Sequence, residues 1–190
     1  MELDKAIKLR KSVKKFKDKK PDWRDIIEVI DSMRYTPMAG NNFTLRFILV
    51  DDKEKIKKIS EASQQPFISQ TDYVLVVCSI PSRTINSFGK KGEIYSRQQT
   101  GAAIQNFLLK IQEKKLATCW IGYFVEEQIK RELTIPGNAN VEAVFPIGYE
   151  FENKKPKQPS RSKRKIELDK ILYFNEYENK KIKKPKKLDV

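Results

Sequence analysis

Apolar residues recur along much of the chain at the three- and four-residue spacing that places them on one face of a helix. The clearest series is Trp23, Ile26, Ile27, Ile30 and Met33. Asp22 follows Pro21 and is placed to cap this helix at its N-terminus, while Pro37 closes the segment. The pattern therefore predicts an amphipathic helix that begins near residue 22 and ends before residue 37.

Weaker versions of the same spacing predict four more helices. They cover residues 3–10, 54–62, 93–115 and 126–133. The helix predicted at residues 93–115 is apolar over a wide arc of its circumference, so we expect it to be the central buried helix. Gly101 within it is expected to allow a neighbouring segment to approach closely.

Short apolar runs between these helices predict strands. They cover residues 46–50, 73–77, 117–121 and 141–148. The run Tyr73-Val74-Leu75-Val76-Val77 has no polar position, which is typical of a strand buried on both faces. A chain of 190 residues with such alternating elements predicts one domain, without an internal repeat.

Charge is distributed unevenly along the sequence. The net charge is +14, of which residues 1–24 carry +6 and residues 153–190 carry +9, so that the middle is close to neutral. Basic ends can bind nucleic acid through phosphate neutralisation, but no recognition helix, aromatic-basic strand motif or zinc finger accompanies them. The run of lysines after residue 179 is better explained as a solubilising tail, with polyanion binding as the alternative.

Composition also excludes several classes of chemistry. Histidine is absent, which removes imidazole bases, Ser-His triads and histidine metal sites. Two cysteines, Cys78 and Cys119, are too few for a disulfide framework and are expected to be buried thiols. No apolar run is long enough for a membrane span or a secretory signal, so we expect a cytoplasmic protein that borrows its chemistry from a cofactor.

Two short segments have the residue types that an anionic, ring-shaped cofactor needs. Arg10-Lys11-Ser12-Val13-Lys14-Lys15-Phe16 combines cations with a hydroxyl, which suits a phosphate monoester. Thr118-Cys119-Trp120-Ile121-Gly122 is a candidate partner loop. The first segment alone is also compatible with a charged, solvated surface.

These two segments belong to a series of five blocks that resembles the FMN-dependent nitroreductase family. In chain order the blocks cover residues 10–16, 36–42, 101–109, 119–122 and 145–149. The resemblance extends over nearly the whole chain. It implies an α+β fold in which a central, mostly antiparallel sheet is flanked by helices, and a homodimer in which the C-terminal segment is exchanged with the partner subunit.

The resemblance also implies a domain organisation and a set of cofactor contacts. Residues 1–178 are expected to form one FMN-binding domain and residues 179–190 a basic tail. The first block assigns Arg10, Lys11, Ser12 and Lys14 to the flavin phosphate and ribityl chain, although Ser12 is also a plausible turn residue. Arg161 and Arg164 resemble late basic residues that return to the phosphate.

The remaining contacts implied by the resemblance concern the isoalloxazine ring. The second block assigns Pro37, Met38, Ala39 and Asn41, usually from the other subunit, although Met38 replaces the usual Ser. Gln64 or Gln65 is expected at the pyrimidine edge or ribityl chain, with an exposed helix end as the alternative. In the loop with Ile121 and Gly122, the Gly122 N–H is expected to point at flavin N5, and Lys14 is a candidate for the N1–C2 edge. Trp120 is expected to be packing.

The function implied is hydride transfer from NAD(P)H to flavin N5, followed by reduction of a nitroaromatic, quinone or flavin acceptor in a ping-pong sequence. No catalytic side chain and no metal are expected. The alternatives are a nucleic-acid-binding protein and a flavin-binding protein without turnover. The basic segment Pro81–Tyr95 occupies the position of the family's variable lid; its charge would favour NADPH or an anionic acceptor, or it is only a solvated loop.

Overall fold

The structure is a computed structural model that describes residues 1–151 and 166–180. The chain divides into two compact units, Met1–Glu152 and Asn153–Val190. The first unit holds the sheet and all but one of the described α-helices. The expectation that a single domain extends to residue 178 stays a prediction.

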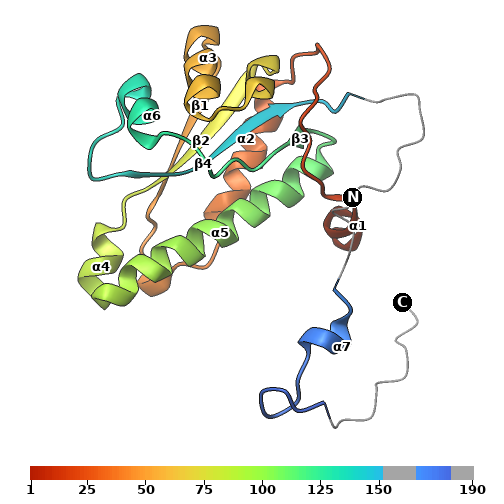
Figure 1. Ribbon diagram of the computed structural model, residues 1–190, viewed down its shortest axis with the longest axis vertical. Coiled ribbons are helices and arrows are strands. Elements are labelled where there is room, and N and C mark those ends of the chain that lie inside the picture. Colours follow the sequence, from red (N-terminus) through yellow and green to blue (C-terminus); the bar gives the residue numbers. More distant parts are fainter. Residues whose placement is uncertain (152–165, 181–190) are drawn as a thin grey trace. The chain divides into compact units, whose positions relative to one another are not determined.

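The centre of the first unit is a four-stranded antiparallel sheet with the order β1-β2-β4-β3 (Figure 1). The strands are β1 (Leu45–Val50), β2 (Tyr73–Ser79), β3 (Ala117–Thr118) and β4 (Asn140–Gly148). All seven residues of β2 are buried, as its continuous apolar sequence predicts. The pairing of β2 with β4 shifts register between Val77 and Cys78, which marks a bulge.

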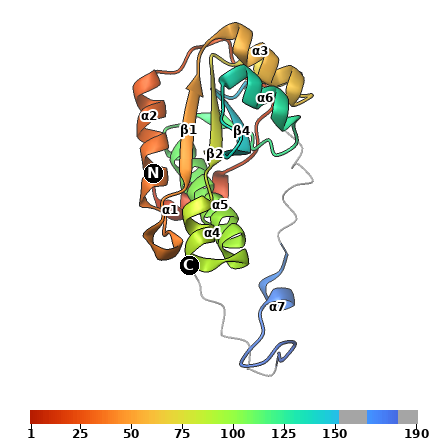
Figure 2. The same ribbon diagram turned by 90° about the vertical axis from the view of Figure 1, so that its left-hand side faces the viewer.

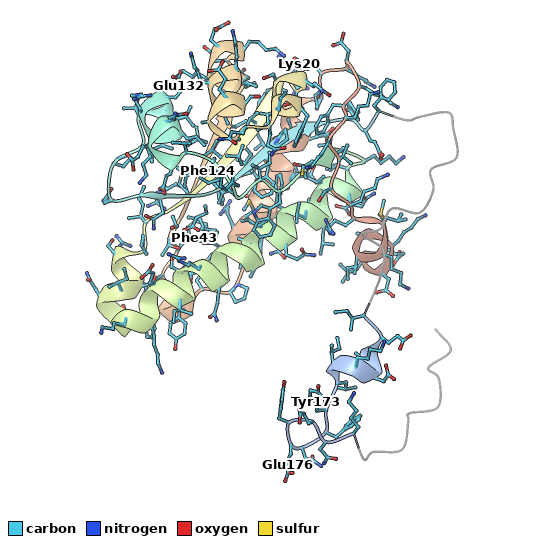
Figure 3. All side chains as sticks on the ribbon, viewed as in Figure 1. Lys20, Phe43, Phe124, Glu132, Tyr173 and Glu176 are labelled. Atoms are coloured by element: carbon cyan, nitrogen blue, oxygen red, sulfur yellow. The ribbon has the colours of Figure 1, made fainter. Side chains whose placement is uncertain are left out.

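One face of the sheet is covered by α3 (Lys53–Ala62) and α6 (Glu126–Leu133). The side chains of Ile56, Ile59 and Ile129 pack there against the alternate β2 residues Val74, Val76 and Cys78. Phe124, labelled in Figure 3, packs against the same cluster from the loop before α6. Both helices begin and end within one residue of the ranges that the sequence predicts.

The opposite face is covered by α2 (Trp23–Asp31) and α5 (Lys90–Glu113), as the second view shows (Figure 2). The other β2 residues, Tyr73, Leu75 and Val77, point to this side. Phe107 of α5 meets Phe145 of β4 with ring centroids 5.0 Å apart. With helices on both faces, the unit is a three-layer arrangement that buries the sheet almost completely.

Helix α2 confirms the predicted cap and corrects the predicted buried face. The Asp22 carboxylate accepts a hydrogen bond from the Arg24 N–H at 2.9 Å. Ile26 and Met33 are fully buried together with Val29, which the sequence pattern did not single out. Trp23 and Ile27 are about half exposed, because the face that meets α5 is centred on Ile26 and Val29 rather than on the whole apolar series.

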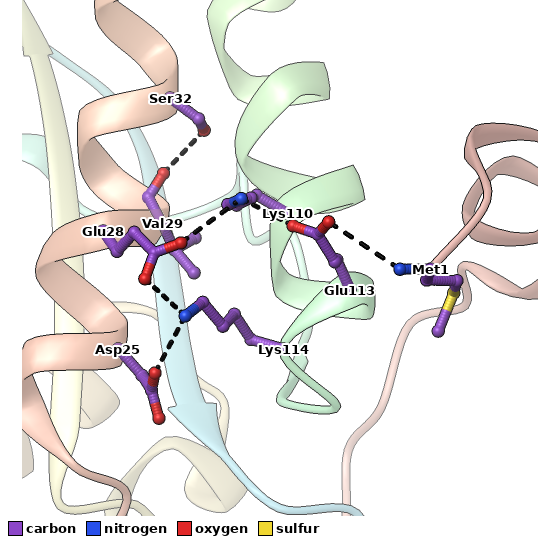
Figure 4. Close-up of polar contacts among 8 residues, drawn as sticks. All are labelled: Met1, Asp25, Glu28, Val29, Ser32, Lys110, Glu113 and Lys114. Atoms are coloured by element: carbon purple, nitrogen blue, oxygen red, sulfur yellow. Dashed lines mark hydrogen bonds and ion pairs between the residues drawn. The ribbon is translucent and has the colours of Figure 1, made fainter.

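Ion pairs link the outer edges of α2 and α5 (Figure 4). Lys114 contacts Asp25 at 3.1 Å and also Glu28, while Lys110 contacts Glu28 at 3.3 Å and Glu113 at 2.6 Å. Hydrogen bonding from Lys114 is the main cause that lowers the pKa of the Glu28 carboxyl. These groups lie at the surface and are only partly buried, and ion pairs of this kind contribute little to the stability of a fold.

The structure contains a helix that the hydrophobic pattern did not predict, α4 (Ser82–Phe88), directly before α5. The chain turns between them at Gly89, whose φ of 58° is in the left-handed region. Gly92, in the first turn of α5, is the point of close approach, since a Cβ there would lie 2.3 Å from the Thr84 carbonyl oxygen. The expected close approach at Gly101 is wrong within the subunit, because a Cβ there would meet nothing within 4 Å.

The remaining helices are short. Helix α1 (Leu3–Leu9) precedes the basic segment, and α7 (Leu168–Ile171) lies in the second unit. Around α7 the apolar residues Ile171 and Leu172 are exposed. The rings of Tyr173 and Tyr177 pack against each other, with centroids 5.0 Å apart. No helix among residues 1–151 and 166–180 is both long and apolar enough to cross a membrane.

Candidate functional site

The basic segment after α1 runs in an extended conformation along one end of the sheet. The Val13 N–H donates to the Thr118 carbonyl oxygen of β3 at 2.9 Å. Further along, the Lys17 N–H donates to Tyr149 O at 2.8 Å, and the Phe151 N–H donates to Lys15 O at 3.0 Å. The segment therefore forms an additional edge beside β3 and the end of β4.

Burial along this segment separates core residues from candidate ligands. Val13 and Phe16 are buried and belong to the core cluster on the α3–α6 side of the sheet. Ser12 and Lys14 are exposed, and Arg10 is half-buried at the end of α1. Neither Arg10 nor Lys14 has a carboxylate partner among the described residues. Both cations are therefore available to a phosphate or another anion.

Lys11 is in a different position from its neighbours. Its Nζ contacts the Glu150 carboxylate at 2.5 Å, so its charge is already paired. This ion pair leaves the backbone of Lys11 as its contribution to an anion site.

The loop after β3 presents Gly122 at the surface. The Ile121 N–H donates to Val144 O, and the Val144 N–H donates to Ile121 O, both at 3.0 Å. Ile121 is buried by this pairing, whereas Trp120 and Gly122 on either side of it are exposed. The Gly122 N–H has no hydrogen-bond partner within residues 1–151 and 166–180, so it remains free to donate.

Trp120 is only partly the packing residue that the sequence predicts. One side of its ring packs near Phe145, with centroids 5.9 Å apart. The side chain is nevertheless 44% exposed, because the adjacent Ile121 occupies the inward position. The exposed indole is a large flat surface beside Gly122.

The basic segment and this loop meet at Cys119. The hydrogen bond from the Val13 N–H to the Thr118 carbonyl oxygen places the basic segment beside the residue that precedes Cys119. Burial raises the pKa of the Cys119 thiol, while the nearby Lys14 and Ser12 side chains lower it in part. The basic segment and the loop after β3, about a hundred positions apart in sequence, are thus neighbours. The prediction that both segments contribute to one cofactor site requires this.

A third segment, Gln64–Gln70, lies against the same place. The Lys14 Nζ is 5.5 Å from the centre of the Phe67 ring, and the Phe16 N–H donates to Gln70 Oε1 at 3.3 Å. Gln64 is exposed with a left-handed φ of 51°, and Gln65 is half-buried. The sequence suggested Gln64 and Gln65 but gave no signal for Phe67 or Gln70, whose contacts depend on tertiary packing.

A cleft of about 350 Å³ opens beside the basic segment. Arg10 and Lys11 line it together with Lys17, Lys115 and Thr118. Lys17 and Lys115 were not predicted as site residues; they are brought to the cleft by the extended segment and by the end of α5. Glu150, which pairs with Lys11, also lines the cleft, so Arg10, Lys17 and Lys115 give it an excess of positive charge that suits an anion.

The predicted loop Pro37–Asn41 is held elsewhere on the subunit. The Ala39 N–H donates to Gln99 Oε1 at 3.1 Å, and Gln99 Nε2 donates to Asn42 O at 3.2 Å. Pro37 and Asn41 are exposed, whereas Met38 packs partly against the core and Ala39 is half-buried. Asn41, like Gly40, has a left-handed backbone, with φ of 56°.

The position of Gln99 on α5 separates this loop from the basic segment. The cleft beside Arg10 contacts α5 at Leu108, Ile111 and Gln112. At a rise of ~1.5 Å per residue, these residues are about 14 to 20 Å from Gln99 along the helix. No hydrogen bond or ion pair within the described ranges joins the loop to Arg10–Lys14. Arg161 and Arg164 lie outside the described residues.

The donor set fits a flavin mononucleotide better than a metal ion. The part of the chain that the structure describes contains no group of three or more Cys, Asp or Glu residues that could hold a metal. In contrast, Arg10 and Lys14 offer charge to a phosphate, and the unpartnered Gly122 N–H with the exposed Trp120 offers a donor and an aromatic surface to a ring. The residues present therefore fit FMN.

Comparison with known proteins gives the class to which this fold and site belong. The sequence matches the nitroreductase family over residues 7–71 and 60–149. The chain belongs to the nitroreductase family, and both the resemblance and the expected antiparallel α+β fold are confirmed.

Two relatives illustrate the range of the family. A protein of Archaeoglobus fulgidus, named as an NADH dehydrogenase/NAD(P)H nitroreductase, is 28% identical over 79% of this chain and 86% of the relative. An iodotyrosine deiodinase of Thermotoga neapolitana is 26% identical over 80% of this chain and 90% of the relative.

Solved structures agree in fold. A nitroreductase family protein from Clostridium difficile 630 superposes with a TM-score of 0.77 at 27% identity, covering 93% of this chain and 99% of that one. An iodotyrosine deiodinase solved with FMN and 3-iodo-L-tyrosine superposes with a TM-score of 0.71 at 23% identity, covering 83% and 94%.

Proposed function

We propose that this protein is an FMN-dependent oxidoreductase that takes hydride from NAD(P)H and reduces a small-molecule acceptor. The observation that carries the proposal is the hydrogen bond from the Val13 N–H to the Thr118 carbonyl oxygen, which places the Arg10–Lys14 segment beside the chain that leads into the Trp120–Gly122 loop. Family membership and the flavin named for the structurally similar deiodinase support the same cofactor.

In this proposal the chain's own residues have distinct roles toward the cofactor. Arg10 and Ser12 bind the phosphate, and Lys17 and Lys115 add to the positive potential at the cleft beside them. Lys14 is placed between this end and Phe67, where it stabilises negative charge on the reduced ring. The Gly122 N–H donates toward N5. When bound, FMN supplies the hydride acceptor, so no acid-base side chain is required.

The proposed active species is a homodimer. The family resemblance assigns Pro37–Asn41 to the ring of the partner's cofactor, and in this subunit Gln99 anchors that loop well away from Arg10 along α5. A complete site then takes the basic segment from one subunit and the loop from the other. The half-exposed Trp23 and Ile27 on α2 leave apolar surface for such an interface.

The proposed kinetic order is ping-pong, because the nicotinamide and the acceptor would use the same exposed face of one ring. The protein contributes position and electrostatics in both halves. The nucleic-acid alternative has less support, since Arg10, Lys17 and Lys115 line a cleft and do not follow one face of a helix.

Anaerobic half-reactions test this function. The purified protein is expected to absorb at about 450 nm as an oxidised flavoprotein, to lose that band when NADPH is added, and to regain it when a nitroaromatic or quinone follows. A yellow protein that NADPH leaves unchanged would reduce the proposal to flavin binding. A colourless protein whose only binding is salt-sensitive attachment to nucleic acid would replace it.

A further inference from the structure

The segment Pro81–Tyr95 is two helices that meet at a fixed corner, not a solvated loop. Helix α4 ends at Gly89 and α5 begins in the next residue. Gly92 lies directly against the backbone of Thr84 and Ile85, so the helices touch without side chains between them. Residues on this corner therefore have defined positions.

The corner is attached to the loop that the proposed function assigns to the flavin ring. The Asn42 side-chain Nδ2 donates to Ser87 Oγ of α4 at 3.3 Å. At Gly40 a Cβ would lie 3.0 Å from Cζ of Phe88, so that ring packs directly on the loop backbone. Whatever the Pro37–Asn41 loop approaches, Phe88 approaches with it.

Aromatic surface is exposed at this junction. Phe88 meets Tyr95 edge-to-face, with centroids 5.4 Å apart, and Phe88 is 38% exposed. Phe43, labelled in Figure 3, follows the same loop and is also 38% exposed. Its ring lies edge-to-face with that of Phe47, with centroids 6.5 Å apart. Such rings bind flat aromatic molecules by stacking and edge contacts.

The same corner is strongly cationic. Between Pro81 and Arg97 the chain has four cations, Arg83, Lys90, Lys91 and Arg97, and one carboxylate, Glu93. Arg97 binds Glu93 at 2.8 Å, which neutralises that carboxylate. Arg83, Lys90 and Lys91 are exposed and form no ion pair within the described ranges. Three positive charges without an ion pair in the described part of the chain thus lie on the same corner as the exposed Phe88 ring.

From these contacts we infer that the acceptor reduced at this site is an anionic aromatic molecule, selected by Phe88 and by the charges of Arg83, Lys90 and Lys91. The inference rests on the proposed function, since the corner reaches the ring only through the Pro37–Asn41 loop. The cations attract the carboxylate or phenolate, and Phe88 contacts the aromatic ring. Loss of charge should therefore affect anionic acceptors only.

The probe for this inference is 4-nitrobenzoate, compared with the uncharged 4-nitrobenzamide. In either case two electrons and two protons convert the nitro group to nitroso and release water. NADPH supplies one hydride, and solvent supplies the second proton. The two compounds differ mainly in charge, so the ratio of their kcat/KM values isolates the electrostatic contribution.

The test variant combines Arg83→Gln, Lys90→Gln and Lys91→Gln. The matched control removes the same number of exposed cations from the distant helices α3 and α6. It combines Lys55→Gln, Lys57→Gln and Arg131→Gln. We expect the 4-nitrobenzoate to 4-nitrobenzamide ratio to fall about tenfold in the test variant alone. The Kd of the non-reducible 4-hydroxybenzoate, measured by its perturbation of the flavin spectrum, should rise by a similar factor. Raising salt from about 0.02 M to about 0.5 M should lower the wild-type ratio in the same direction.

An unchanged ratio and an unchanged Kd in a test variant with full flavin content would overturn the inference while leaving the proposed function intact. A wild-type ratio that does not respond to salt would overturn it as well. Absence of flavin or of NADPH oxidation in the wild-type protein would instead contradict the proposed function itself.

Discussion

Arg10→Ala combined with Lys14→Ala is expected to yield a folded protein that purifies without flavin colour. Both side chains are accessible and lack carboxylate partners in the described part of the chain, so the fold does not depend on their charges. Each charge-assisted hydrogen bond to a phosphate or ring oxygen contributes ~1.5–3 kcal/mol. Losing two should weaken FMN binding about 100-fold or more, measured as flavin absorbance per subunit after gel filtration.

The matched control for this variant is Lys55→Ala with Lys57→Ala, which removes the same charge from exposed positions on α3. It should keep the flavin content of the wild-type protein. Full yellow absorbance in the Arg10, Lys14 variant would refute the assignment of the phosphate to the basic segment.

Gly92→Ala is expected to cost at least about 3 kcal/mol of the free energy of unfolding, at the upper end of overpacking effects. The added methyl carbon would lie 2.3 Å from the Thr84 carbonyl oxygen and 2.6 Å from the Ile85 Cα. Both are backbone atoms, so no side-chain rotation relieves the overlap and α4 must move away from α5. Urea unfolding followed by circular dichroism measures the change.

Gly137→Ala is the control, because the same methyl group there meets no atom within 4 Å. Its free energy of unfolding should stay within about 0.5 kcal/mol of the wild-type value. If Gly92→Ala were equally harmless, the tight corner that supports the acceptor inference would not exist.

The sequence predicted those elements whose hydrophobic spacing is set by burial against the sheet. The strand at residues 73–77 and the helix at residues 126–133 are correct, since one is apolar throughout and the other has a regular polar and apolar pattern. Helix α4 was missed because its sequence is mostly polar: only Thr84 is buried, and the helix is held by the Gly92 contact rather than by an apolar face.

The candidate site was predictable in its segments but not in its partners. Residue type and the family resemblance predicted a role in cofactor binding for Arg10, Ser12 and Lys14. The structure leaves all three side chains accessible. The neighbours Phe67, Gln70 and Lys115 are recruited by long-range packing, which a single sequence does not encode as a local pattern. The sequence alone did not distinguish Lys90 and Lys91 from the charged residues of a solvated loop. In the structure they lie at the start of α5, where the α4–α5 corner fixes their backbone positions.

Titration of the flavin-free protein with FMN and with riboflavin, followed by quenching of flavin fluorescence, tests the central claim most directly. Riboflavin has the same ring as FMN but no phosphate. The contacts of the ring with the Trp120–Gly122 loop are therefore the same for both ligands, and the difference in Kd measures what the basic segment contributes through the phosphate. We predict that FMN binds at least about 100-fold more tightly than riboflavin, and that Arg10→Ala with Ser12→Ala removes most of this difference. Equal affinity for the two flavins, or binding of neither, would contradict the account.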